Sequence, residues 1–125
     1  MKKIVATEKA PGAIGPYSQA VEAGNIIYVS GQLPINPASG QFAGETIEEQ
    51  TRQSLTNMKN ILESSGYSMD GVVKTTVFLK DIADFAAMNG VYAQFFAKDC
   101  PARSAFQVAN LPKNAKIEIE AIAVK

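Results

Sequence analysis

The sequence predicts a single α+β domain over residues 1–125, with a six-stranded mixed sheet covered on one face by two helices. Apolar-alternating segments are grouped near both ends of the chain, which is typical of antiparallel strands. Between these groups, two segments with helical spacing flank one strand, and strand-helix-strand units usually have parallel strands. The predicted order is therefore β-β-β-α-β-α-β-β, and 125 residues are enough to bury one core.

Three strand-like segments open the chain. Residues 2–6 predict a short strand, and the Pro- and Gly-rich stretch 10–18 predicts an ordered loop. Residues 18–24 and 25–31 alternate in polarity on either side of a Gly-Asn pair, which indicates a hairpin. The segment 32–45 is rich in Pro, Gly, Ser and Asn, so we expect a long loop before the first helix.

The segment 46–66 has the clearest helical pattern. Thr46 and Glu49 have the spacing of a capping box, in which each side chain binds a free backbone N–H at the helix start. Gly66 is well placed to end the helix in a left-handed conformation. The apolar residues at helical spacing are Ile47, Leu55, Met58, Ile61 and Leu62. A strand rich in β-branched residues is expected to follow at 72–80.

A second helix is expected within residues 81–98. Asp81 or Asp84 could cap it, and Pro101 prevents it from continuing. Gly90 is unfavourable inside a helix, so we expect it to permit a close approach by another backbone. The apolar stripe consists of Phe85, Met88, Tyr92, Phe95 and Phe96. This stripe should pack on the sheet.

The last two strands are expected at 102–109 and 116–125. Along 116–125 one side is apolar throughout, while the other changes from two glutamates to Ile122 and Val124. A strand face open to water should stay polar, so we infer that the helix-free face is partly buried against other subunits in a small closed ring. The alternative is that these side chains are scattered surface apolar residues, which are common.

Composition excludes several classes of protein. The chain has no histidine and Cys100 is its one cysteine, so internal disulfides, the usual zinc sites and histidine-based triads cannot form. Twelve basic residues balance twelve acidic ones, which argues against binding to nucleic acid. The apolar run at the N-terminus is too short for a signal peptide and no membrane span occurs, so we expect a cytoplasmic protein.

Arg103 is the main candidate for a functional residue. An arginine at the start of a buried strand needs an acidic partner. In the structural interpretation it pairs with Glu118 or Glu120, which could lie beside it if the last two strands are antiparallel neighbours. In the functional interpretation it binds a ligand carboxylate through two parallel hydrogen bonds. Glu118 and Glu120 have two interpretations of their own. They are either part of a solvated strand face, or one of them is a general acid/base or a water-positioning group beside the guanidinium.

The remaining polar candidates have simple structural interpretations. Tyr17 follows Gly-Pro and could be a loop anchor, whereas Ser30 precedes a glycine at a strand end and could bind backbone. Cys100, just before Pro101, is interpreted as a small buried apolar residue. No Ser-His or Cys-His pair exists to activate a nucleophile, so covalent hydrolysis is not expected.

Four stretches of the chain resemble the RidA family of enamine/imine deaminases, also called the YjgF type: AIGPYSQAV, YVSGQLPINPASG, VVKTTVFLKD and PARSAFQVANLPKNAKIEIEAIAVK. The resemblance extends from residue 3 to residue 125. It implies a fold similar to that of trimeric chorismate mutases, with a curved sheet, two outer helices, a barrel-like ring of three subunits and ligand clefts between subunits.

The resemblance also implies an activity, the hydrolysis of imino and enamino acids such as 2-aminoacrylate to 2-keto acids and ammonia, without a metal or organic cofactor. Matched by position, Arg103 is the carboxylate-binding arginine and Glu118 the acidic site residue. The cleft-lining positions are Tyr17, Ser30, Gly31, Asn89 and Ala105. Many members have cysteine where this chain has Ala105, so no role for a thiol is expected.

Two other functions remain open at the level of sequence. The same cleft could belong to a non-catalytic module that binds 2-keto acids and reports to a protein partner. Some relatives of the family have been described as RNA-cleaving translation inhibitors, although balanced charge and the lack of histidine argue against that here.

Overall fold

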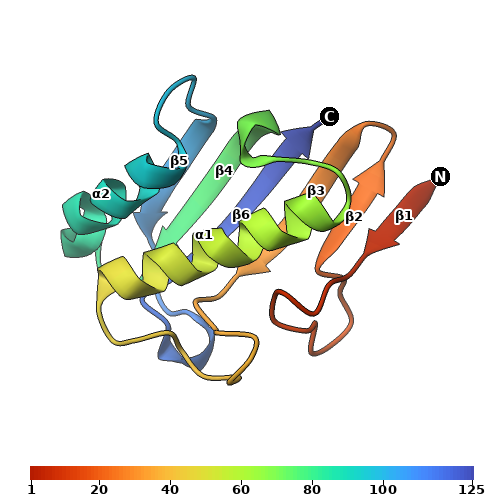
Figure 1. The fold of residues 1–125 in the computed structure, drawn as a ribbon. Coiled ribbons are helices and arrows are strands. Elements are labelled where there is room, and N and C mark those ends of the chain that lie inside the picture. Colours follow the sequence, from red (N-terminus) through yellow and green to blue (C-terminus); the bar gives the residue numbers. More distant parts are fainter.

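The computed structural model describes residues 1–125 and has the predicted order of elements, with both helices on one face of a single sheet (Figure 1). The strands are β1 (Lys2–Val5), β2 (Ala20–Ala23), β3 (Ile26–Gln32), β4 (Val72–Leu79), β5 (Ala102–Gln107) and β6 (Ile117–Val124). The helices are α1 (Ile47–Ser64) and α2 (Phe85–Phe95). Short 3₁₀ turns cover Met69–Gly71, Ile82–Asp84 and Pro112–Asn114.

The strands lie in the order β1-β2-β3-β6-β4-β5. Neighbouring strands are antiparallel except for β4 and β5, which are parallel and joined through α2. The last two strands of the sequence are therefore not neighbours, and the pairing that would have placed Arg103 beside the two glutamates is wrong. β6 suits the centre because one side is fully buried and the other partly so, whereas β5 is mostly accessible and forms an edge.

The first helix begins and ends as its sequence predicts. The hydroxyl of Thr46 accepts a hydrogen bond from the backbone N–H of Glu49 at 3.1 Å, and the Glu49 carboxylate accepts one from the Thr46 N–H at 3.3 Å. The hydrogen bond from Thr46 also lowers the pKa of the Glu49 carboxyl. Gly66 has φ of 78°, the left-handed conformation expected after the helix.

The second helix is shorter than expected. Residues 82–84 form a 3₁₀ turn, and the Asp81 carboxylate caps it by accepting a hydrogen bond from the Ala83 N–H at 2.9 Å. Asp84 stands at the start of α2 without a capping hydrogen bond from its side chain. The expectation for Gly90 is wrong, because a Cβ at this exposed position would have no neighbour within 4 Å.

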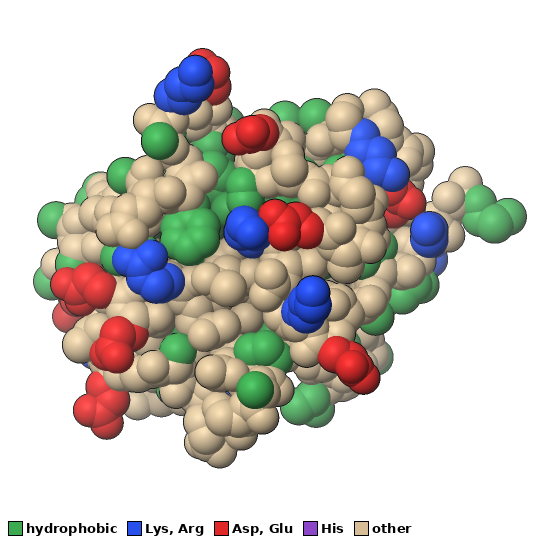
Figure 2. All heavy atoms as spheres, viewed as in Figure 1, with side chains coloured by type: hydrophobic (Ala, Val, Ile, Leu, Met, Phe, Trp, Pro, Cys, Tyr) green, Lys and Arg blue, Asp and Glu red, His purple; other side chains and the backbone are tan.

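The core lies between the sheet and the helices. Its fully buried members include Leu55, Met58, Ile61, Leu62, Val77, Leu79, Ile117 and Ile119. The opposite, helix-free face carries apolar side chains open to solvent in the single chain, among them Tyr28 at 48% exposure and Phe106 at 44%. From the side that carries the helices, Figure 2 shows acidic and basic side chains interspersed. Neither helix has the length and apolar character needed to cross a membrane.

Candidate functional site

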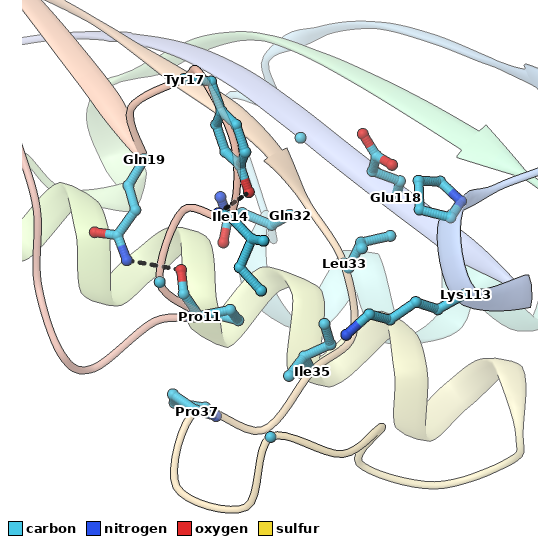
Figure 3. A pocket seen from close by; sticks show the side chains of 14 residues that line it. Pro11, Ile14, Tyr17, Gln19, Gln32, Leu33, Ile35, Pro37, Lys113 and Glu118 are labelled. Atoms are coloured by element: carbon cyan, nitrogen blue, oxygen red, sulfur yellow. Dashed lines mark hydrogen bonds between the residues drawn. The ribbon is translucent and has the colours of Figure 1, made fainter.

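One hollow of about 510 Å³ collects several of the candidate residues. Its walls come from the loop before β2, the end of β3, the loop after β3 and the turn before β6 (Figure 3). Tyr17 lies on one side of the hollow and Glu118 on the other. Gly31 also lines it, and Lys113 extends along it from the turn before β6. Residues distant in sequence therefore meet where several loops converge.

A β-bulge in β3 shapes the wall beside Glu118. The pairing of β3 with β6 shifts register between Val29 and Gln32, and Ser30 and Gly31 lie in this irregular stretch. A Cβ on Gly31 would overlap the carboxylate of Glu118. The absence of a side chain at Gly31 therefore allows the Glu118 carboxylate to lie against the β3 backbone.

The Glu118 carboxylate forms no salt bridge within the chain. It lies on the helix-free face of β6, opposite Phe78 of β4. Both salt bridges of the chain involve other residues, namely Lys59 with Glu63 and Lys125 with Glu22. Partial burial raises the pKa of the Glu118 carboxyl, and the like charge of Glu120 raises it further. A carboxyl of this kind can exchange a proton more readily near neutral pH than an ordinary glutamate.

Hydrogen bonds fix the loop that carries Tyr17. The Ser30 hydroxyl donates to the Ser18 carbonyl at 2.6 Å, and the Ser30 N–H donates to the Gln19 carbonyl at 2.9 Å. Buried Gln19 donates to the carbonyl of Pro11 at 2.8 Å. The Tyr17 hydroxyl accepts a hydrogen bond of 3.4 Å from a loop N–H. The interpretation of Ser30 as a residue that binds backbone is thus confirmed. Tyr17 is 52% exposed and the single hydrogen bond of its side chain is long, so its role as a loop anchor stays a prediction.

A second group of candidates surrounds Arg103 on edge strand β5. Arg103 lies opposite Thr75 of β4, on the face of the sheet covered by helices. Its Nη1 donates a 2.7 Å hydrogen bond to Oδ1 of Asn89 on α2. Ala105 lies two residues further along the same face and packs against the core. Cys100 is exposed, contrary to the expectation that it is buried.

The guanidinium of Arg103 has no carboxylate partner in its own chain. Neither Glu118 nor Glu120 forms a salt bridge with it. The strand registers explain why, because both glutamates point to the helix-free face whereas Arg103 points to the face with helices. The interpretation of Arg103 as one half of an internal ion pair is therefore wrong.

The structure thus divides the predicted residues into two half-sites on opposite faces of the sheet. Tyr17, Gly31 and Glu118 line the hollow, with Ser30 beside them, while Asn89 and Ala105 accompany Arg103. The chain contains no cluster of three or more His, Cys, Asp or Glu residues that could hold a metal ion.

Some residues of the half-sites were missed from sequence. Phe85 and Tyr92 had been assigned only to an apolar stripe, yet both rings contact the guanidinium of Arg103. Their spacing from Asn89, four residues before and three after, places all three on one side of a helix and could have indicated the contact. Lys113 lies between the last two predicted strands, and no pattern in the sequence marks it as a residue of the hollow.

Comparisons with known proteins agree over essentially the whole chain. The family model described as endoribonuclease L-PSP matches residues 7–125. An Escherichia coli K12 protein named 2-iminobutanoate/2-iminopropanoate deaminase is 52% identical over 128 residues, covering 100% of this chain and 99% of that protein. A Capra hircus protein of the same name is 53% identical over 125 residues, covering 100% and 91%. The crystal structure of Escherichia coli TdcF with bound serine superposes with a TM-score of 0.95 at 48% identity, covering 98% of each chain.

Proposed function

We propose that this chain hydrolyses reactive imino and enamino acids such as 2-aminoacrylate to 2-keto acids and ammonia. The chain belongs to the RidA family, whose family model is described as endoribonuclease L-PSP. Full-length identity of 52–53% to proteins named 2-iminobutanoate/2-iminopropanoate deaminase is the main support. The unpaired Arg103 supports the same activity, because a permanently charged guanidinium without an internal partner suits a substrate that carries a carboxylate. The TdcF structure holds serine, a carboxylate ligand.

The complete site, in this proposal, lies between subunits of a homotrimer. Arg103 and Glu118 point to opposite faces of one sheet, so they cannot act together on a small molecule within one chain. The helix-free face of the sheet carries exposed apolar side chains that another copy could cover. Arg103 of one subunit would then complete the hollow beside Glu118 of its neighbour. The single free thiol accords with a cytoplasmic location.

The proposed mechanism assigns binding and proton transfer to different residues. Arg103 holds the substrate carboxylate while the enamine tautomerises to its imine. Glu118 accepts a proton from a water molecule as the water oxygen attacks the imine carbon, and it returns the proton to nitrogen. The resulting carbinolamine collapses to the keto acid as ammonia leaves. Because imines already hydrolyse unaided, positioning and acid-base help of about 10²- to 10⁴-fold are sufficient.

The function is tested by generating imino acids in situ with an amino-acid oxidase or a serine dehydratase and following their loss. The deaminase proposal predicts faster loss of imine and faster release of ammonia with the wild-type chain. A non-catalytic module would bind 2-keto acids without changing either rate. An RNA-cleaving protein would instead degrade RNA and leave the rate of imine loss unchanged. That result would contradict the proposal.

Gly31→Ala should damage the site without unfolding the protein. The added methyl group must displace the Glu118 carboxylate, because both would occupy the same space. A shift of about 1 Å in a reacting group can cost on the order of 10²-fold in rate. We therefore expect kcat for imine hydrolysis to fall by roughly that factor in steady-state assays. Gly90→Ala is the matched control, since its Cβ meets nothing within 4 Å, and equal losses in both variants would contradict this role.

A further inference from the structure

Two aromatic rings of α2 form a shelf under the guanidinium of Arg103. The guanidinium carbon lies 4.7 Å from the centre of the Tyr92 ring and 5.5 Å from that of Phe85. Asn89, between them on the same side of the helix, accepts the 2.7 Å hydrogen bond from Nη1. Asn89 is the one hydrogen-bond partner of the Arg103 side chain, which leaves the edge formed by Nε and Nη2 free. That edge has the geometry for a side-on pair of hydrogen bonds to a carboxylate.

Tyr92 is itself held firmly in place. It is 6% exposed, and its hydroxyl shares a 2.7 Å hydrogen bond with the hydroxyl of Thr75, which is fully buried. Thr75 is also the residue opposite Arg103 in the pairing of β4 with β5. The Tyr92 ring further packs against Phe96, with ring centres 4.7 Å apart. The shelf and the arginine are therefore fixed to the same point of the sheet.

We propose that Tyr92 is a positioning residue for the carboxylate-binding arginine. Its ring holds the guanidinium flat by a cation-π contact, and Asn89 sets the rotation, so that the free edge is already oriented before a substrate arrives. Burial raises the pKa of the Tyr92 hydroxyl, a group that is already neutral at physiological pH. This inference rests on the proposed role of Arg103, but it concerns binding and not the chemical step.

The role is tested by comparing ligands that differ only in charge. Binding of 2-oxobutanoate and of its neutral amide, 2-oxobutanamide, would be measured by calorimetry with the wild type and with Tyr92→Leu. Loss of the ring should weaken the binding of 2-oxobutanoate by roughly tenfold and leave the affinity for the amide within about twofold. The reason is that the ring orients the Arg103 guanidinium for its two-point contact with a carboxylate, which the neutral amide does not form. In assays of imine hydrolysis the same variant should raise KM more than it lowers kcat.

Tyr67→Leu is the matched control. Tyr67 is also buried, its ring lies 4.9 Å from the Lys125 ammonium, and its hydroxyl bonds Glu22, so its loss costs similar packing in a different place. It should leave the affinity for 2-oxobutanoate unchanged. Phe85→Leu, at a half-buried ring, is the second variant if Tyr92→Leu does not fold, and should weaken 2-oxobutanoate about threefold with the amide unaffected.

Three results would overturn the inference. They are equal weakening of both ligands, no weakening of 2-oxobutanoate in either shelf variant, and a wild type that binds no 2-oxobutanoate. A wild type that binds 2-oxobutanoate more tightly than the amide but does not hydrolyse imines would remove the proposed deaminase function alone. The charge-selective loss in Tyr92→Leu would still support the positioning role in that case.

Discussion

Replacing Arg103 with alanine should lower kcat/KM for imino acids by about 10²- to 10⁴-fold. The substitution removes two charge-assisted hydrogen bonds to the substrate carboxylate, each worth roughly 1.5–3 kcal/mol. Arg103→Lys should recover only part of the loss, because an ammonium group cannot form the planar two-point contact. Steady-state assays with imines generated in situ would measure both variants.

Arg52→Ala is the natural control for this prediction. Arg52 is the chain's only other arginine, and its guanidinium donates a 2.7 Å hydrogen bond to Gln94 at the exposed surface of the helices. Its loss should leave activity within about twofold of the wild type. Arg103 forms no salt bridge but contacts Asn89 and two aromatic rings, so Arg103→Ala should lower the unfolding temperature by only a few degrees. An Arg103→Ala protein that retains wild-type kcat/KM would contradict the proposed role.

Glu118→Gln should lower kcat by about 10²- to 10⁴-fold and yet make the fold no less stable at neutral pH. The activity falls because an amide cannot accept a proton from water. The stability effect follows from the raised pKa of Glu118, whose first cause is burial and second the charge of Glu120. Such a carboxyl favours folding below its ordinary pKa and loses this contribution as pH rises through the raised value. At neutral pH the charged form therefore opposes folding.

Thermal unfolding measured across pH would check the direction of this effect on stability. At pH 7 the Glu118→Gln protein should unfold at the same or a higher temperature than the wild type, and this advantage should shrink near pH 4. Glu120→Gln is the matched control on the same strand face. Glu120→Gln should keep the wild-type value of kcat at the pH optimum. Removal of the like charge should lower the pKa of Glu118 and so move the acid limb of the pH profile to lower pH. Equal losses of kcat in the two variants would contradict the assignment.

Local signals in the sequence predicted the elements well. The capping box at Thr46, the glycine after α1 and the turn between β2 and β3 are interactions among residues close in sequence, and all are confirmed. The order of strands was less accessible, because it depends on pairings between distant segments. The position of β6 between β3 and β4 is the main example. Its apolar residues on both sides are typical of an oligomer contact and equally of a central strand, and the pattern alone does not distinguish the two.

In the candidate site, too, features local to one strand were predictable from sequence, whereas features that depend on distant segments were not. Side-chain parity within one strand correctly put Glu118 and Glu120 on one face. Parity cannot compare two strands whose registers are unknown, so the sequence could not reveal that Arg103 points to the other face. The bulge that brings Gly31 against Glu118 and the aromatic shelf are also products of packing between distant segments. The two half-sites became evident only in the folded chain.

The central claim is that Arg103 of one subunit works with Glu118 of the next. Co-expression of Arg103→Ala chains with Glu118→Gln chains tests this claim, because every mixed trimer would contain one site with both residues intact. If the chains assemble at random in equal amounts, three quarters of the trimers are mixed and one site in three is complete in each, which gives about a quarter of wild-type activity.

The measurement is the rate of imine hydrolysis by the co-expressed chains, compared with each variant alone. The account predicts that two proteins with little activity separately regain about a quarter of the wild-type rate when assembled together. A co-assembled protein no more active than the two separate variants would contradict the shared site.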